Sequence, residues 1–226
     1  TMDYNYNRLI SKSAPYNKHI NDVTYSYSDG RVSKVVQGEH YLTTFYTYDE
    51  LGNMVYERKE IQIPGKGRSR FLSYFTYDSF GRIHRVQYPD NEKAWYYYGR
   101  GGELERITSG FEENDVTPVI DSILYDGYGN TAFIGYGNDM YASFDYNTNT
   151  RRLSNHKLFF DNGTPQYYLN KNFGYDRRGN VDTVVNTGYT TIQSNGHRMG
   201  GKYNMYYHYD TQNRLDQVYN GSGFDT

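Results

Sequence analysis

The sequence predicts an all-β fold in which tandem β-hairpins form a curved antiparallel meander. Tyr occurs 29 times among the 226 residues, and Tyr favours strands over helices. Gly occurs 23 times and is spread along the chain, which disfavours long helices. One short pattern that contains Tyr, Asp and Gly recurs from end to end. These three observations indicate repeated strands joined by regular turns.

Tyrosine also supplies the core that this composition otherwise lacks. Leu, Ile, Val and Phe make up only 43 of the 226 residues, a fraction at which a strongly charged chain would be disordered. The formal net charge is only -2, and the tyrosine rings provide the missing apolar area. We therefore expect an ordered protein.

The composition excludes several classes of protein. With 24 Lys and Arg against 26 Asp and Glu, the chain lacks the basic excess of a nucleic-acid-binding protein. The longest apolar run, residues 94–98, is far shorter than the roughly 20 residues of a membrane-spanning helix. Cysteine is absent, which excludes disulfides, thiolate catalysis and cysteine-ligated zinc. The first residues contain no signal-peptide segment, so we expect any export signal outside this sequence.

The repeated pattern is aromatic-x-Tyr-Asp-x-x-Gly-[Asn/Arg]-aliphatic, and it occurs eight times. A truncated further copy is expected at residues 3–9. The spacings between successive key tyrosines are 21, 29, 21, 27, 21, 29 and 34 residues, which suggests a unit of 21 with longer gaps as insertions. The key tyrosines are Tyr27, Tyr48, Tyr77, Tyr98, Tyr125, Tyr146, Tyr175 and Tyr209.

Each copy is expected to form a β-hairpin. The aromatic residue and the key tyrosine are two positions apart, so both face the same side of a strand. The Asp carboxylate can accept the backbone N–H two residues on, and the Gly three residues after it supplies the positive φ of a type I turn with a G1 bulge. The complete Asp and Gly pairs are Asp49/Gly52, Asp78/Gly81, Asp126/Gly129 and Asp176/Gly179, and the last copy has Asp210/Asn213.

Three copies depart from this pattern. The first is one residue short and the sixth is one residue longer, so their turns should differ. In the fourth, Gly99 replaces Asp and removes the carboxylate. The return strand often carries a second apolar residue three positions after the aliphatic one, as in Ile83 and Val86. Because three is odd, we expect a bulge or a change of face between the two.

Other turn signals separate the copies. They lie at Gly38, 89–91, 137–138, 161–163 and 195–196, and Asn-Gly between apolar runs is a strong hairpin signal. Residues 60–72 read as a hairpin with a Pro-Gly tip, whereas residues 111–122 read as the most loop-like stretch. No linker interrupts the pattern, so residues 1–226 are expected to form a single domain.

The repeats resemble the Rhs or YD-repeat family over residues 25–219. Besides the main pattern, YNTNTRRL (146–153) resembles the family's longer variant, QYPDNEKAWYYYG (87–99) its PDG-type turn, and YHYDTQNRL (207–215) the variant near the core that follows the repeats. The family includes bacterial Rhs proteins, wall-associated proteins, the C components of insecticidal toxin complexes and the animal teneurins.

The resemblance implies a non-enzymatic structural module. In this family the hairpins form a strip that spirals into a hollow shell, which can enclose a C-terminal toxin. The expected partners are the rest of the parent shell and its cargo, with no nucleic acid and no membrane span, in a secreted or cell-surface bacterial protein of which this chain is a fragment. The family's self-cleaving aspartate motif is not found here.

Catalytic and cofactor chemistry is not indicated by the residues. The six histidines have no metal-ligand spacing, and the glycine-rich segments 64–69 and 99–102 lack the spacing of nucleotide-binding loops. We expect no catalytic, cofactor-binding or metal-binding residue. A hydrolase remains the weakest hypothesis and would need two facing carboxylates in a cleft. Lys59, Lys66, Arg68 and Arg70 read as a solvated basic hairpin tip that could touch an acidic partner.

The alternative function is binding of carbohydrate or of a surface partner. Exposed aromatic side chains can stack on sugar rings, but the regular recurrence of the key tyrosines favours a structural role for them. The better ligand candidates lie outside the repeat positions. They are Tyr136, Tyr141, Tyr167, Tyr168 and Tyr189.

Three structural expectations follow. The turn glycines and Asn213 should have positive φ, so that Gly81→Val costs more stability than Gly65→Val at a tip that can relax. The key tyrosines should be shielded while the charged side chains of the return strands face water. The open edges near Tyr6 and Tyr219 should pair with another copy or fray.

Overall fold

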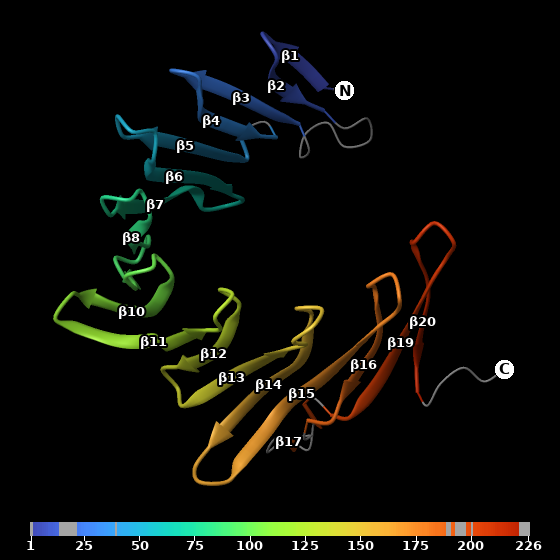
Figure 1. The fold of residues 1–226 in the computed structure, drawn as a ribbon. Coiled ribbons are helices and arrows are strands. Elements are labelled where there is room, and N and C mark those ends of the chain that lie inside the picture. The colour runs from blue at the N-terminus through green and yellow to red at the C-terminus, as the bar shows by residue number, and fades with distance from the viewer. Residues whose placement is uncertain are drawn as a thin grey trace. The chain divides into compact units, whose positions relative to one another are not determined.

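The computed structural model describes residues 2–13, 22–38, 40–188, 191–192, 198–199 and 201–221. Within these ranges every assigned helix or strand is a β-strand, and each described pairing between strands is antiparallel. Eighteen of these strands belong to one sheet, and the two remaining strands pair with each other. The all-β hairpin meander predicted from the sequence is confirmed (Figure 1).

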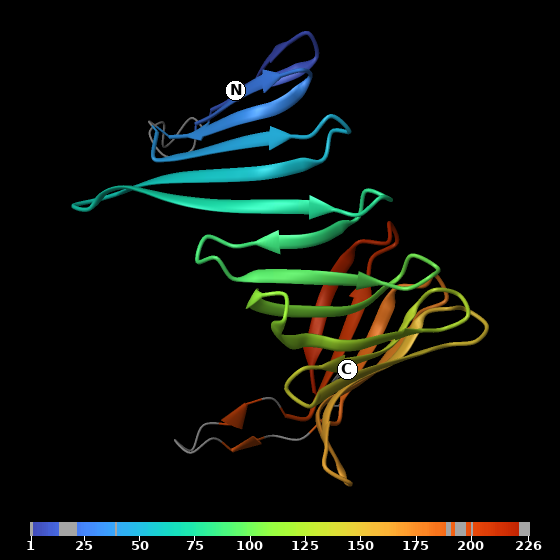
Figure 2. The same cartoon turned by 90° about the vertical axis from the view of Figure 1, so that its left-hand side faces the viewer.

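The chain divides into two compact units, the first comprising Thr1–Tyr97 and Ser109–Val116. Its strands pair with their neighbours in chain order, and Figure 2 shows β3 to β8 lying side by side in that order. They are β1 (Met2–Asn5), β2 (Arg8–Lys12), β3 (Val23–Ser28), β4 (Arg31–Gln37), β5 (Leu42–Tyr48), β6 (Met54–Ile63), β7 (Gly67–Tyr77), β8 (Ile83–Gln87) and β9 (Lys93–Tyr98).

The second unit comprises Tyr98–Thr108 and Thr117–Thr226. The hairpin strands β10 (Leu104–Glu112) and β11 (Asp115–Tyr125) contribute residues to both units. The others are β12 (Thr131–Tyr136), β13 (Met140–Tyr146), β14 (Leu153–Asp161), β15 (Pro165–Tyr175), β16 (Val181–Asn186), β17 (Thr191–Ile192), β18 (Arg198–Met199), β19 (Tyr203–Tyr209) and β20 (Leu215–Asn220). β16 pairs with β19, and β17 with β18 forms a separate short hairpin between them.

The odd spacing of apolar residues in the return strands is caused by a bulge next to each key tyrosine. Tyr77 pairs with Ile83, but the preceding Thr76 pairs with Arg85, so His84 is an extra residue in the return strand. The same shift occurs in the other described repeat hairpins. The extra residue shifts the alternation by one position. Ile83 and Val86, which pair with Tyr77 and Phe75, therefore face the same side of the sheet. The bulge prediction is confirmed.

Most turn predictions are confirmed, with one correction. The hairpin of residues 60–72 forms as expected, and the predicted turn at residues 195–196 lies outside the described residues. The loop prediction for residues 111–122 is wrong, because β10 and β11 extend to Glu112 and from Asp115. The β-branched residues Val116, Thr117, Val119 and Ile120 are a strand signal that the acidic residues before them concealed.

Positive φ values at Gly52, Gly81, Gly129 and Gly179, and a φ of 66° at Asn213, confirm the expectation for the repeat turns. Gly65 at the hairpin tip also has a positive φ, of 75°. A Val would therefore be strained by the backbone at Gly65 as well as at Gly81. The lower cost expected of Gly65→Val depends only on the ability of an exposed tip to relax, and it stays a prediction.

Few side chains are deeply buried. Among the described residues the buried apolar side chains are Val86, Ala94, Trp95, Ile123, Ala142 and Val184. A single sheet whose strands pair edge to edge has two half-exposed faces, and shielding must come from neighbouring strands of the same layer. The contacts between successive hairpins therefore determine the stability of the fold.

Candidate functional site

The repeat turns place an aspartate carboxylate at the centre of a small hydrogen-bond network. In the fifth copy, Asp126 accepts the backbone N–H groups of Tyr128 and Asn130, each at 2.9 Å, and its second oxygen accepts the Asn130 side-chain amide at 2.9 Å. The backbone closes the turn through Gly129 N to Asp126 O at 3.1 Å. Equivalent bonds to the turn carboxylate occur at Asp49, Asp78, Asp176 and Asp210.

These bonds stabilise the ionised carboxylate. At Asp176 the side-chain bond from Asn180 and then the backbone N–H groups lower the pKa, and at Asp49 and Asp126 the side-chain bond is again the largest cause. At Asp78 partial burial opposes the shift, yet the bonds from Arg82 leave the pKa lowered. The turn aspartates are therefore charged acceptors with no proton to donate near neutral pH.

Of the three divergent copies, the first and the sixth use other turns, as expected, and the fourth keeps the turn without its carboxylate. Gly99 and Gly102 form the same backbone turn without a carboxylate. The short first copy has a two-residue turn in which Asp29 and Gly30 both have positive φ. The long sixth copy has a wider turn, in which Arg151 N donates to Asn147 O at 2.8 Å. The carboxylate is thus an addition to a turn whose backbone geometry does not require it.

The key tyrosines connect each hairpin to the one before it. At seven of the key tyrosines the hydroxyl donates to the backbone carbonyl of the first or second residue of the preceding return strand. The distances are 2.7–3.1 Å. The pairs are Tyr27 to Leu9, Tyr48 to Val32, Tyr77 to Met54, Tyr125 to Leu104, Tyr146 to Thr131, Tyr175 to Leu153 and Tyr209 to Val181.

The hydroxyl bond occupies the place where backbone pairing between hairpins ends. Between β6 and β7 the last pair is Tyr56 with Tyr74, and Tyr77 then reaches Met54 two residues beyond it. The same offset recurs in every described pairing of a return strand with the next tyrosine strand. Those last pairs are Ser11/Thr24, Lys34/Phe45, Tyr56/Tyr74, Arg85/Trp95, Phe133/Ser143, Asn155/Asn172 and Thr183/Tyr206.

A second link between hairpins was not predicted. The Arg31 guanidinium lies 5.8 Å from the Tyr48 ring centroid, and Arg152 lies 5.4 Å from that of Tyr175. A Cβ added to Gly179 would meet Arg152 Nη2 at 2.0 Å. The arginine of one turn therefore lies against the glycine of the next. The sequence signal was the Arg before the aliphatic residue in copies that lack Asp directly after the key tyrosine.

The key tyrosines are shielded, but one charged side chain is too. All eight are half-buried, and the pKa values of Tyr77, Tyr125 and Tyr146 are raised, chiefly by desolvation and then by a nearby carboxylate.

The expectation that charges of the return strands face water is wrong at Glu60, which is 6% exposed. Glu60 lies in ion pairs with Arg68 at 3.2 Å and Arg70 at 3.1 Å. The basic hairpin tip thus has its acidic partner within the same hairpin.

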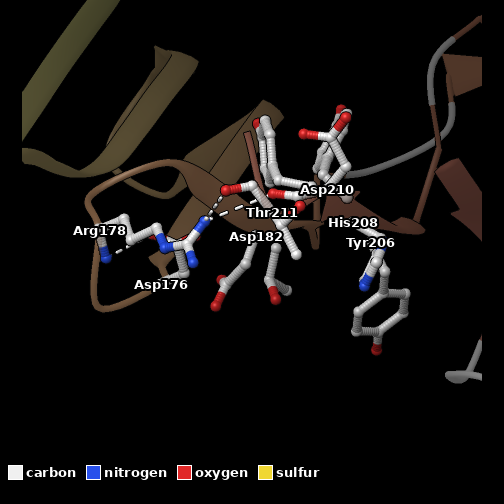
Figure 3. A pocket seen from close by; sticks show the side chains of 10 residues that line it. Asp176, Arg178, Asp182, Tyr206, His208, Asp210 and Thr211 are labelled. Atoms are coloured by element: carbon white, nitrogen blue, oxygen red, sulfur yellow. Dashed lines mark hydrogen bonds between the residues drawn. The ribbon is translucent and has the colours of Figure 1, made fainter. Parts of the chain in front are cut away.

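A groove of about 400 Å³ lies between two successive turns of the second unit. Asp176, Asp182 and Asp210 line it, and Arg178 donates to the backbone carbonyls of Asp210 at 3.4 Å and Thr211 at 3.5 Å (Figure 3). Asp176 and Asp210 hold their own turns as charged acceptors. Neither Asp176 nor Asp210 therefore offers the protonated carboxyl that the hydrolase hypothesis needs. Across the described ranges, no group of three or more His, Asp or Glu side chains could hold a metal ion.

Four aromatic rings form a row across β12 to β15. Tyr141 stacks on Phe133 at 5.7 Å between centroids and contacts Phe159 at 5.7 Å, and Phe159 contacts Tyr167 at 5.6 Å. Tyr141 is five residues before Tyr146 in β13, so the row lies on the face opposite the key tyrosine. Of the ligand candidates, Tyr141 and Tyr167 join this row.

The other ligand candidates do not join the row. Tyr136 and Tyr168 are half-buried, and Tyr189 lies outside the described residues. Tyr168 is the extra residue of a bulge, since Leu158 pairs with Leu169 and Phe159 with Tyr167. The row could have been found only by knowing the register, because its members are spread over 35 residues of sequence.

Comparison with solved structures identifies the fold. The chain superposes on the crystal structure of TcdB2-TccC3-Cdc42 with a TM-score of 0.69 and 16% identity, covering 96% of this chain and 12% of that one. For TcdB2-TccC3 the TM-score is 0.68 with 17% identity, again covering 96% and 12%. For the Tc holotoxin pore of Photorhabdus luminescens it is 0.66 with 14% identity, covering 97% and 14%. The chain has the YD-repeat fold.

The YD-repeat fold is thus shared with toxin-complex proteins at low identity, and this chain spans about an eighth of their length. No family model matches the sequence, and no curated protein matches it either. Among the described residues there is no helix with the length and apolar character needed to cross a membrane. What the YD-repeat neighbours share with this chain is the hairpin architecture and its strand order.

Proposed function

We propose that this chain is a non-enzymatic segment of a secreted or cell-surface bacterial shell that encloses a C-terminal toxin or effector. Residues 1–226 would form one YD-repeat domain of a larger protein. The observation that carries the proposal is the uniform link between hairpins, in which each key tyrosine binds the preceding return strand. Such a link lets the strip be extended by further copies without any change of geometry.

The remaining chemistry of the chain supports a structural role. Each recurring residue holds a turn or joins two hairpins, and the charged turn aspartates are engaged by backbone N–H groups. The sheet has half-exposed faces and few deeply buried side chains, which suits a wall that is completed by other parts of a larger protein. The structural neighbours are toxin-complex proteins.

The test uses the full-length product of the gene that encodes this chain. Limited proteolysis of the native protein should leave the segment C-terminal to the repeats intact. Brief opening of the shell with urea should expose that segment to cleavage. The control is the same segment fused to an unrelated carrier, which should be cut without urea. Cleavage at equal rates in the native protein and on the carrier would refute enclosure.

The alternative function is binding of a glycan or of a surface partner, and the aromatic row of Phe133, Tyr141, Phe159 and Tyr167 favours it. Adjacent half-buried rings on one face can stack on the apolar faces of sugar rings. A glycan array probed with the chain tests this. Tyr167→Ala should remove any signal, and Phe80→Ala, an exposed ring outside the row, should leave it unchanged. Signals that persist in Tyr167→Ala would exclude the row as the binding site.

A further inference from the structure

One face of the β6–β7 hairpin gathers three arginine side chains around a single buried carboxylate. Glu60 is 6% exposed. Its Oε1 lies 3.1 Å from Arg70 Nε and 3.5 Å from Arg58 Nε, and its Oε2 lies 3.2 Å from Arg68 Nη1. One counter-ion therefore holds the three guanidinium groups next to one another.

The strand register explains this arrangement. Glu60 pairs with Arg70 across the hairpin, and Arg58 and Arg68 each lie two residues before a member of this pair. Because alternate residues of a strand share a face, all four side chains lie on one side of the sheet. In the described structure β8 pairs with β7 only from Tyr74 onward, and Figure 2 shows the tip of this hairpin reaching beyond the neighbouring strands of the unit. The arginines of β7 are therefore accessible.

The cluster carries more positive charge than its counter-ion balances. Within the described strands β4 to β7, Glu60 is the only acidic residue on this face. Three guanidinium groups against one carboxylate leave an excess of positive charge, and Lys34 lies on the same face, 5.5 Å from the Phe45 ring centroid. A phosphate monoester carries a charge of about −1.5 to −2 at neutral pH. It therefore matches this excess better than a carboxylate or a sulfate ester, which carries a single charge.

Arg58 keeps a donor that the chain does not use. Its guanidinium carbon lies 4.0 Å from the Phe45 ring centroid, and this contact fixes the group. Its Nε is buried and has no hydrogen-bond partner among the described residues, although it lies within ion-pair distance of Glu60. An unused buried donor on a fixed guanidinium indicates a group prepared for an added acceptor.

We propose that Arg58, Arg68 and Arg70 bind the phosphate group of a soluble phosphate monoester, such as a phosphorylated sugar. The planar guanidinium groups donate paired N–H groups to the phosphate oxygens, and Glu60 holds the arginines in place from below. This inference concerns a binding site on one hairpin, and it does not depend on whether the parent protein encloses a cargo.

The surroundings of the cluster favour a sugar ester over free phosphate and over a lipid. Tyr56 lies two residues before Arg58 and pairs with Tyr74, with the two ring centroids 5.0 Å apart. Tyr74 is 42% exposed, and such rings can pack against the apolar face of a sugar. The tip residues 64–66 are Pro, Gly and Lys, which provide no large apolar side chain to enter a bilayer.

Isothermal titration calorimetry of the chain with glucose 6-phosphate tests the site, at constant ionic strength and about pH 7.5, where the ester is a dianion. Arg58→Lys and Arg70→Lys keep the charge but remove the planar fork, so each should weaken binding at least about fivefold. Arg70 has a side chain that is 68% exposed, so its variant should fold even if Arg58→Lys does not. Lys59→Gln removes a charge from the opposite face and should change the affinity by less than about twofold.

Matched probes identify the ligand chemistry. Methyl sulfate has the shape of methyl phosphate but a single charge, so it should bind at least about threefold more weakly. Methyl phosphate should in turn bind more weakly than glucose 6-phosphate, and Tyr74→Ala should remove that difference.

The proposal is overturned if glucose 6-phosphate does not bind, or if it binds the parent, Arg58→Lys and Arg70→Lys chains equally. An equal loss in Lys59→Gln would also overturn it, because the attraction would then be unspecific. Equal affinities for methyl phosphate and methyl sulfate would refute the assignment of a dianion, and equal affinities for methyl phosphate and glucose 6-phosphate would refute the sugar. Tighter binding to vesicles that contain phosphatidic acid than to glucose 6-phosphate would refute the soluble ligand in favour of a lipid headgroup.

Discussion

The turn Asp126–Asn130 allows the energetic cost of its positive-φ position to be measured in isolation. Gly129 has a φ of 83°, whereas Gly127 in the same turn lies outside the positive region. A Cβ added at either position meets no atom within 4 Å. Gly127→Ala and Gly129→Ala therefore differ in backbone conformation and in little else.

The magnitude follows from cancellation between the two variants. Gly→Ala removes the same freedom from the unfolded chain in both, which by itself stabilises by about 0.4–1 kcal/mol. Only Gly129→Ala places a Cβ in the left-handed region, at a cost of about 1–2 kcal/mol. The two variants should differ by that cost, which corresponds to about 2–8 °C in Tm for a chain of this size.

Urea and thermal unfolding followed by far-ultraviolet circular dichroism measure this difference. Gly127→Ala should unfold at or above the midpoint of the parent chain, and Gly129→Ala below it. Gly129→Asn should lie between them, because Asn213 adopts a φ of 66° at the same repeat position. Equal midpoints for Gly127→Ala and Gly129→Ala would refute the assignment of a strained position to this turn.

Three further outcomes test the links within and between repeats. Tyr175→Phe should lower the free energy of unfolding by about 1–2 kcal/mol, because it leaves a part-buried carbonyl without its hydroxyl donor, whereas Tyr167→Phe should change it little; equal effects would argue against the hydroxyl link. Asp176 has a lowered pKa, so its stabilising effect is present above its ordinary value of about 3.9 and is lost as pH falls through the folded-state pKa. Asp176→Asn should accordingly lose less stability than the parent between pH 7 and pH 3 in urea titrations, and identical acid losses would contradict this. Glu60→Gln should destabilise by about 1–2 kcal/mol, less than a wholly buried ion pair because the arginines can turn to water, while Glu113→Gln at an exposed tip should be neutral by the same unfolding assay.

Local chemistry explains why so much of the fold could be predicted from the sequence. An Asp followed three residues later by Gly specifies its turn through bonds within five residues, as at Asp78, and the aromatic alternation before it specifies a strand. The loop prediction at residues 111–122 failed because the acidic residues and Asn of residues 112–115 outweighed the β-branched residues that follow. The prediction that Glu60 is exposed failed because its arginine partners lie on the facing strand of the hairpin. Which residues face each other across a hairpin is known only from the strand register.

The contacts between hairpins could not be predicted, because they depend on the register between strands of successive hairpins. β14 and β15 pair as far as Asn155 with Asn172. This register brings the Tyr175 hydroxyl to Leu153 rather than to a neighbouring carbonyl. Period and spacing identified the eight tyrosines as equivalent, but the identity of their acceptor required the three-dimensional register.

The residue after the turn glycine controls how strongly successive repeats are coupled. Where a carboxylate lies four residues earlier, this residue bonds to it, as in Asn53, Arg82, Asn130, Asn180 and Arg214. Asn180 also donates to Asn213 of the next turn at 2.6 Å. Where no carboxylate lies there, the arginine extends over the ring of the next key tyrosine, as in Arg8, Arg31 and Arg152. Where this position holds arginine, the presence of the Asp in the same turn therefore determines whether the arginine stabilises its own turn or the junction with the next hairpin. The first and sixth copies are consequently not degenerate repeats, because the loss of the local bond frees Arg31 and Arg152 to join neighbouring hairpins.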